Sequence, residues 1–141
     1  MDVQNLVSKM IAQHRGLQKD LGTALDLSSR IDFDAAAILQ SLEVFKKDLI
    51  EHLELENGTF YVGLLKKMRE KGWDTANTEL FIKEMDVIAK TVMDFLNKYS
   101  GSDSITSSIA GFKQQLPEII NTLNLRIESE ESGVYSYWGL F

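Results

Sequence analysis

The sequence predicts an all-α protein, an antiparallel up-down-up-down four-helix bundle that forms one domain over residues 1–141. Apolar residues recur at intervals of three and four along most of the chain, which is the spacing of one helix face. One proline and nine glycines in 141 residues leave few positions that oppose helix formation. Short polar segments separate the periodic stretches, as expected where neighbouring helices are antiparallel.

The first two helices are expected over residues 2–27 and 33–71, with Asp2 as the N-cap of the first. Asn57-Gly58 is a turn signal inside the second helix, and the helical pattern resumes directly after it. The sequence therefore predicts a kink or bulge at this position within one long helix, with a true break between two helices as the alternative. Helix irregularities of this kind are often found at functional sites.

The third helix is expected over residues 75–99 and the fourth over residues 105–136. The segment 99–106, YSGSDSIT, is the clearest loop in the chain. The aromatic tail at residues 135–141 is expected to pack over one end of the bundle. An exposed apolar tail could also serve as an association surface.

Composition excludes several classes of function. A net charge of -6 and a pI near 4.9 oppose binding to nucleic acid or to an anionic membrane, because both need a basic patch. The absence of cysteine excludes disulfides, thiolate metal sites and cysteine nucleophiles. No leader-like N-terminus and no run of about 20 apolar residues is present, so the expected location is the cytoplasm. No GxSxG elbow or glycine-rich phosphate loop is present either, and the protein is not expected to be an enzyme.

Polar residues interrupt the apolar stripes, and every expected helix carries at least one of them. They are His14, His52, Glu56, Glu84, Arg126 and Glu130. An unpaired polar group in a core costs about 1 to 3 kcal/mol, so these side chains need partners inside the fold. Metal sites in helix bundles are built from inward histidines and carboxylates, and this ligand set suits iron, manganese or zinc. The neighbouring Glu128 and Glu131 are expected to face solvent.

Arg126 offers an alternative to a metal ion. Its guanidinium could pair with the carboxylates of Glu56, Glu84 and Glu130, or its stem could cover the stripe while its charge reaches water. Three ionised acids and one arginine give the cluster a formal charge of -2. If this excess negative charge is buried, the carboxylates must bind a cation, have raised pKa values or turn partly toward water. The sequence leaves these outcomes open.

Three segments resemble the hemerythrin-like (HHE cation-binding) domains. LIEHLELENGTFY at 49–61 resembles the second-helix signature, in which a histidine and a glutamate four residues later bind iron and a tyrosine follows. IAQHRGL at 11–17 resembles the first-helix histidine motif of that family, and LNLRIESEESGVY at 123–135 resembles its fourth-helix motif. The resemblance in length and helix order covers nearly the whole chain.

This resemblance implies a mono- or dinuclear iron site with the ligands His14, His52, Glu56 and Glu130. Arg126 stands where the family places a histidine on the fourth helix, and the third helix has no histidine. Glu84 is the nearest occupant of the third-helix position and is a candidate fifth ligand. The resemblance thus implies a degraded or rearranged metal site in a protein that acts by sensing or regulatory binding.

Two readings from other functional classes stay open. The chain could be a metal-free bundle that binds a protein partner through its acidic surface or through residues 135–141. Histidine phosphotransfer domains are also four-helix bundles, and HRGLQKDLGTAL at 14–25 resembles their histidine helix. A phosphorylated histidine must be exposed, whereas His14 falls on the inner stripe, so this reading is the least favoured. The sequence does not predict the oligomeric state.

Overall fold

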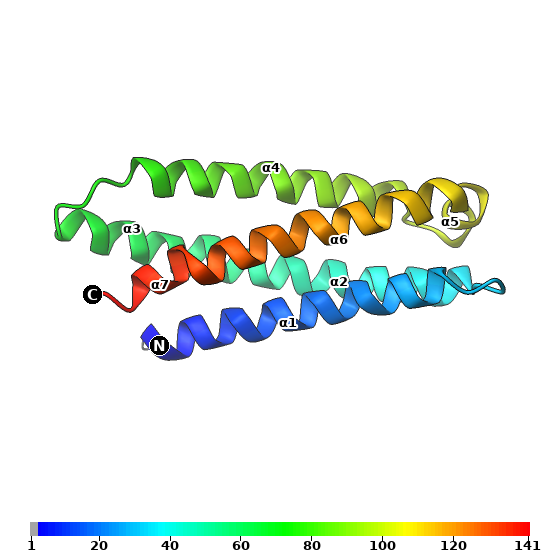
Figure 1. Cartoon of the computed structure of the whole chain (residues 1–141), viewed down its shortest axis with the longest axis horizontal. Helices are drawn as coiled ribbons and strands as arrows, with labels where there is room; N and C mark the ends of the chain where they lie inside the picture. Colours follow the sequence, from blue (N-terminus) through cyan, green and yellow to red (C-terminus); the bar gives the residue numbers. More distant parts are fainter. Residues whose placement is uncertain (1–2) are drawn as a thin grey trace.

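The computed structural model describes residues 3–141, and these residues form helices joined by short turns, with no strand among them (Figure 1). The helices are α1 (Val3–Ser28), α2 (Ala35–Leu55), the π-helix η1 (Glu56–Phe60), α3 (Tyr61–Glu70), α4 (Ala76–Lys98), α5 (Ser102–Ser107), α6 (Ile109–Ser132) and α7 (Val134–Trp138). The predicted all-α fold is confirmed. Asp2, the expected N-cap of the first helix, lies outside the described residues.

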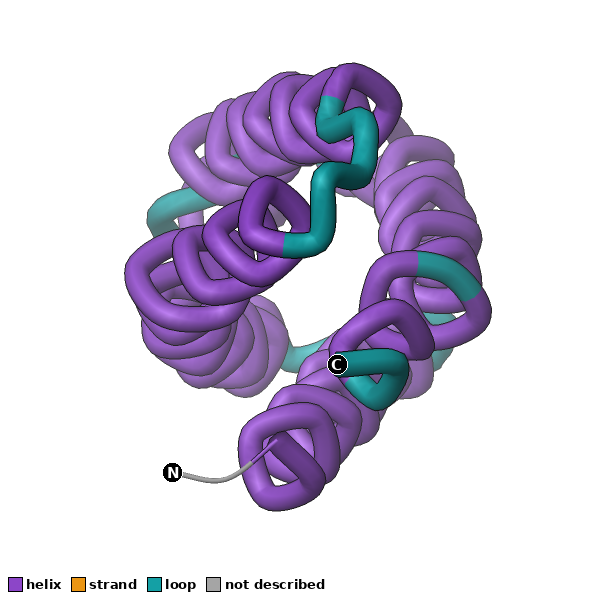
Figure 2. Tube along the Cα trace, turned by 90° about the vertical axis from the view of Figure 1, so that its left-hand side faces the viewer, coloured by secondary structure: helices purple, strands orange, loops and turns teal. Residues whose placement is uncertain are grey.

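The long helices lie side by side along the long axis of the molecule. Figure 2, which looks along this axis, places them around a common centre. The start of α1 and the end of α7 lie at the same end of the bundle in Figure 1. No helix in the range 3–141 is both long enough and apolar enough to cross a membrane.

Helix α2 carries the buried face that leads to the polar cluster. Asp34 caps this helix, because its Oδ1 accepts hydrogen bonds from the backbone N–H groups of Ala36 and Ala37 at 3.0 and 3.3 Å. The buried side chains that follow are Ile38, Leu42, Phe45, Leu49 and His52. Their spacing of three and four residues holds them on one side of the helix, so His52 points where the core leucines point.

The helix widens for one turn at η1, where the sequence predicts a kink or bulge at Asn57-Gly58. The backbone N–H of Tyr61 donates to the carbonyl of Glu56, the five-residue spacing of a π-helix. The additional residue in this turn shifts the buried face of the helix. As a result Glu56, Phe60 and Tyr61 are all buried, and the helix continues into α3.

The last part of the chain differs from the single helix expected over residues 105–136. It is divided into α5, α6 and α7, with breaks at Ser108 and Gly133. A Cβ atom at Gly133 would lie 2.6 Å from the carbonyl oxygen of Ser129, so the close turn there requires glycine. This turn directs α7 back onto the bundle and buries Tyr135 and Trp138.

The buried apolar residues form two separate cores. The body core contains Leu17, Leu21, Ala24, Ile38, Leu42, Phe45, Leu49, Val92, Phe95, Leu96, Tyr99, Ile105, Phe112, Leu116, Ile119, Leu123 and Ile127. The end core contains Leu6, Met10, Phe60, Tyr61, Leu64, Met68, Val134, Tyr135 and Trp138. The aromatic tail thus contributes to the end core, as the sequence predicts.

A buried polar residue lies between the two cores on each of three helical segments. On α1, His14 lies between Met10 of the end core and Leu17 of the body core. The same order occurs at Leu49, Glu56 and Phe60 on α2 and η1, and at Ile127, Glu130 and Val134 on α6 and α7. The polar cluster therefore separates the two apolar regions.

Candidate metal centre

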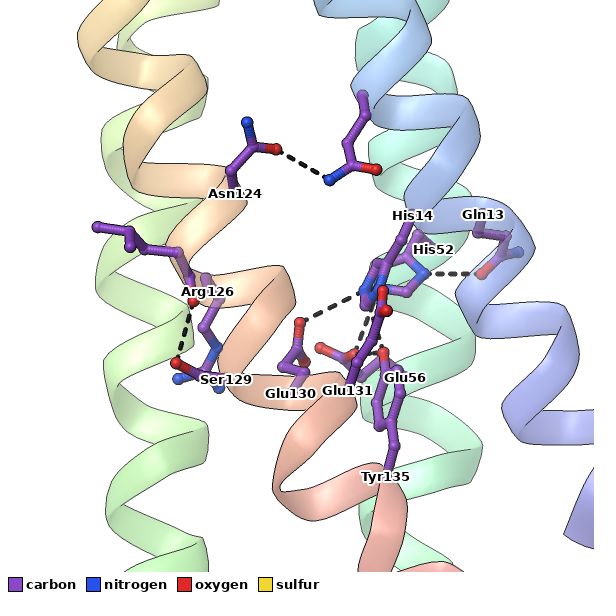
Figure 3. Close-up of polar contacts among 12 residues, drawn as sticks. Gln13, His14, His52, Glu56, Asn124, Arg126, Ser129, Glu130, Glu131 and Tyr135 are labelled. Carbon is purple, nitrogen blue, oxygen red and sulfur yellow. Dashed lines mark hydrogen bonds and ion pairs between the residues drawn. The ribbon is translucent and has the colours of Figure 1, made fainter.

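Four side chains from four helical segments converge between the two cores. They are His14 from α1, His52 from α2, Glu56 from η1 and Glu130 from α6. One ligand atom from each lies within 4.8 Å of the others, and none of the four residues is more than 2% exposed. Figure 3 shows their side chains pointing toward one another. The structure thus brings together the four residues that the family resemblance implies as ligands.

The inward-facing atoms are two imidazole nitrogens and two carboxylate oxygens. His14 Nε2 lies 3.2 Å from His52 Nε2 and 3.5 Å from Glu130 Oε1. His52 Nε2 lies 3.3 Å from Glu56 Oε2, one helical turn along the chain. Two ligand atoms on opposite sides of one ion with bonds of about 2.1 Å are about 4.2 Å apart, so these atoms are close to the spacing that one ion requires.

Both histidines are held by a hydrogen bond at the nitrogen that faces away from the cluster. His14 Nδ1 donates to Glu131 Oε2 at 2.8 Å, and His52 Nδ1 donates to the amide oxygen of Gln13 at 2.7 Å. These bonds place a proton on Nδ1 and leave Nε2 as the inward-facing atom of each neutral ring. Histidine ligands of metal ions are held in the same way.

Gln13 and Glu131 were not identified by sequence reasoning, which expected Glu131 to face solvent. Each is adjacent in sequence to a cluster residue, so it lies at the border of the buried face. Glu131 also forms an ion pair with the exposed Arg15, which joins α1 to α6 beside the cluster. The only signal for these contacts in the sequence is adjacency to His14 and Glu130.

Two tyrosines donate hydrogen bonds to the carboxylates. Tyr135 Oη donates to Glu56 Oε2 at 2.6 Å and lies 3.2 Å from His14 Nε2. Its ring stacks against the His14 ring, with centroids 5.4 Å apart and an interplanar angle of 12°. Tyr61 Oη donates to Glu130 Oε2 at 2.9 Å. Each cluster carboxylate is therefore oriented by one phenol.

Arg126 is buried beside the cluster but does not contact a carboxylate directly. Its Nη2 donates to the backbone carbonyl of Phe81 at 2.8 Å and lies 3.5 Å from Tyr61 Oη, and its Cζ lies 3.3 Å from the centre of the Phe81 ring. Within residues 3–141 it forms no ion pair with Glu56, Glu84 or Glu130. Arg126 thus neither bridges the glutamates nor reaches water, and its charge acts on Glu130 through Tyr61.

Glu84 is not brought to the cluster. It is exposed on α4, where the buried positions include Thr78, Met85 and Val92. This seven-residue spacing directs Met85 inward and its neighbour Glu84 outward. In the described chain the four clustered ligand residues come from the other helices, so α4 supplies none of them.

Burial and close contact separate the proton affinities of the two glutamates. Burial, the hydrogen bond to Glu56 and the negative charge of that residue together raise the pKa of Glu130 to about 9, although the positive charge of Arg126 lowers it. Burial also opposes ionisation of Glu56, but its contacts with His52, Glu130 and Tyr135 outweigh burial and hold the pKa of Glu56 below its usual range. The pair therefore shares a proton when no cation is present.

The histidine and carboxylate atoms fit a metal ion on two further observations. Burial lowers the pKa of His14 despite its hydrogen bond to Glu131, which favours the neutral imidazole that metal binding requires. Glu56 Oε1 is buried and has no hydrogen-bond partner, which leaves an acceptor for a cation. Two imidazoles and two carboxylates are a suitable donor set for iron, manganese or zinc.

Comparison with known families gives one match. A family model described as the hemerythrin HHE cation binding domain matches residues 5–138. No match was found among curated proteins or among solved structures. The matched range contains all four clustered residues and extends from α1 to the end of α7.

Proposed function

The chain belongs to the hemerythrin HHE cation-binding domain family, and from this premise we propose that it binds one iron ion at a rearranged site and acts in sensing or regulatory binding. The proposed ligands are His14, His52, Glu56 and Glu130. The observation that carries the proposal is the convergence of their four buried ligand atoms within 4.8 Å, with both histidine Nε2 atoms facing inward. We also infer the up-down-up-down order of the bundle, which the directions of α1, α2, α4 and α6 in Figure 1 support.

A single ion is supported by the side of the cluster that faces α4. Arg126 lies there, buried on Phe81, and is linked to Glu130 through the hydroxyl of Tyr61. A second cation next to this fixed positive charge would be repelled, and in a poorly solvated site that repulsion is weakly screened. The two carboxylates and one divalent ion would balance without a second metal.

The residues of this chain determine what a bound ion would experience. Glu131 and Gln13 orient the two imidazoles, and Tyr61 and Tyr135 orient the two carboxylates. When bound, iron supplies Lewis acidity and a one-electron redox couple. The proton on Glu130 must leave when this carboxylate binds a cation, so ion binding and proton release are coupled.

A regulatory role is supported by the way the cluster joins separate helices. The ligands His14 on α1 and Glu56 on η1 contact the hydroxyl of Tyr135, which lies on α7, the last helix of the chain. A change in the ion or its ligands therefore alters how α7 is held against the bundle. Through this link, binding of the ion can change the protein surface at α7. Such a change does not require a substrate-binding site.

A metal-free protein that binds another protein is the second candidate. It is favoured by the raised pKa of Glu130, because a shared proton can satisfy the two carboxylates without an ion. Phosphotransfer at His14 is disfavoured, since only 1% of this residue is exposed.

The test is elemental analysis of protein expressed in medium supplemented with iron and manganese. Wild type and the matched control Glu84→Ala, which removes an exposed glutamate outside the cluster, are expected to hold about one ion per chain. His52→Ala is expected to hold less than about a tenth of an ion per chain, with circular dichroism to establish that it remains helical. Wild type with less than about a tenth of an ion would exclude the metal site and leave the protein-binding candidate.

A further inference from the structure

The hydroxyl of Tyr135 lies among the inward-facing atoms of the cluster. Its Oη is 2.6 Å from Glu56 Oε2 and 3.2 Å from His14 Nε2. The same oxygen of Glu56 lies 3.3 Å from His52 Nε2. Tyr135 Oη is thus as close to the ligand atoms as these atoms are to one another, and Figure 3 shows its ring extending from below into the group.

Tyr61 makes a similar hydrogen bond from a different side. It donates to Glu130 Oε2, whereas the other oxygen of this carboxylate, Oε1, is the one that faces His14. Tyr61 Oη is also 3.5 Å from the guanidinium of Arg126. Its oxygen therefore lies on the outer side of Glu130 and next to a positive charge, both of which oppose contact with the ion.

From this contrast we propose that Tyr135 is a fifth ligand of the ion and binds through its phenolate oxygen, while Tyr61 only positions Glu130. The proposal rests on the proposed function, since it requires that the cluster holds a metal. On binding, the Oη–H bond of Tyr135 breaks as the oxygen–metal bond forms, and the proton is released to water with no change in the oxidation state of the metal. Loss of protons from ligands is the usual accompaniment of metal binding.

The ring of Tyr135 is held in place by its surroundings. It stacks on His14 and meets Phe60 edge-on, with centroids 5.0 Å apart and an interplanar angle of 77°. The turn at Gly133, which has no space for a Cβ atom, directs the start of α7 toward the cluster. Tyr135 is therefore positioned by packing independently of its hydrogen bond to Glu56.

A phenolate ligand changes the charge of the site. Glu56, Glu130 and Tyr135 together supply three anionic oxygens, which match the charge of ferric iron. Hard, anionic oxygen ligands also favour the higher oxidation state. The ferric form is therefore the one in which Tyr135 ligation is expected and can be observed, because phenolate bound to ferric iron absorbs visible light.

The test compares iron-loaded wild type with Tyr135→Phe and the matched control Tyr61→Phe. Each is loaded with ferric iron, its iron content is measured, and its visible absorption and resonance Raman spectra are recorded. We expect a visible band with phenolate ring modes in wild type and in Tyr61→Phe, and no band in iron-containing Tyr135→Phe. A band that persists in Tyr135→Phe, or that disappears in Tyr61→Phe, would overturn the assignment.

Iron content separates failure of this inference from failure of the proposed function. Wild type that holds iron without phenolate modes would exclude Tyr135 as a ligand and leave the four-residue site intact. Wild type that holds no iron would exclude both. If Tyr135→Phe holds no iron, its spectrum cannot test the inference, and Tyr61→Phe and Tyr137→Phe are used instead. The phenolate ring modes are expected to persist in both variants. Their loss in either one would overturn the inference.

Discussion

His14 Nε2 and His52 Nε2 face each other at 3.2 Å between α1 and α2, and each ring is fixed by an acceptor on its opposite nitrogen. Two inward nitrogen lone pairs at this distance repel each other unless a proton or a cation lies between them. A proton can satisfy one pair of atoms, whereas a metal ion can satisfy both histidines and both glutamates together. The arrangement of the outer hydrogen bonds therefore bears directly on metal affinity.

Loss of the Glu131 carboxylate is expected to weaken metal binding without removing a ligand. Glu131→Ala should lower the affinity about 10- to 100-fold, because the His14 ring loses the hydrogen bond that orients it. The measurement is competition for the ion with a chelator of known affinity. Glu128→Ala is the control, since Glu128 is exposed on the same helix. Equal affinities in both variants would contradict a role for Glu131.

Removal of the ion is expected to lower the melting temperature. An ion at 100 times its dissociation constant stabilises the folded chain by about 2.7 kcal/mol, which corresponds to about 10 °C for a domain of this size. The measurement is thermal unfolding followed by circular dichroism with and without chelator. His52→Ala should melt at the same temperature in both conditions. A chelator effect of equal size in this variant would point to a different ion site.

The metal-free protein is expected to lose stability as the pH rises from about 4.5 to about 9. The pKa of Glu130 is raised from 4.5 to about 9 by burial and by Glu56, so the folded chain holds a proton that the unfolded chain has released. This stability is fully present below pH 4.5 and is lost as the pH passes the folded value. Urea unfolding at a series of pH values in chelator measures it.

Glu130→Gln provides the control for this pH dependence. Its amide imitates the protonated carboxyl, so the slope of stability between these pH values should become smaller. Glu84→Gln, at an exposed position, should leave the slope unchanged. An unaltered slope in Glu130→Gln would assign the pH dependence to another group.

Gly133→Ala is expected to destabilise the protein by about 1 to 3 kcal/mol, because the new Cβ must displace the Ser129 carbonyl or shift α7. Gly22→Ala is the control, since a Cβ there has no neighbour within 4 Å and a helix interior favours alanine by about 0.5 to 1 kcal/mol. Urea unfolding of both variants measures the difference. Similar stabilities would show that α7 adjusts at no cost.

The helical fold and the four clustered residues could be anticipated because both depend on spacing along one helix. The interval from His52 to Glu56 is one helical turn, so the two side chains share a face whatever the partner helix is. The position of Glu84 could not be fixed in this way. The periodicity of α4 allows either Glu84 or Met85 to lie on the buried face. Packing of α4 against the other helices decides between them, and the structure has Met85 buried and Glu84 exposed.

Three other features depend on geometry that periodicity does not reveal. The apolar pattern continues through Gly133 and predicts a single final helix, but the backbone leaves the helical conformation at Gly133, with φ of -108° and ψ of -102°. The Asn57-Gly58 dipeptide predicts an irregular turn, but it does not predict that the π-helical turn buries both Phe60 and Tyr61. Gln13 and Glu131 reach the histidines only because α1, α2 and α6 meet at this level.

The polar cluster divides the apolar interior into the body core and the end core. Substitutions more than about 7 to 10 Å apart usually have additive effects on stability. Residues deep in the body core, such as Phe45 and Phe112, can therefore vary with little effect on the ion, whereas residues of the end core hold Tyr135 and α7. As such a sequence diverges, substitutions in the body core can therefore change thermal stability while the affinity for the ion is kept. Substitutions in the end core can change the affinity for the ion separately.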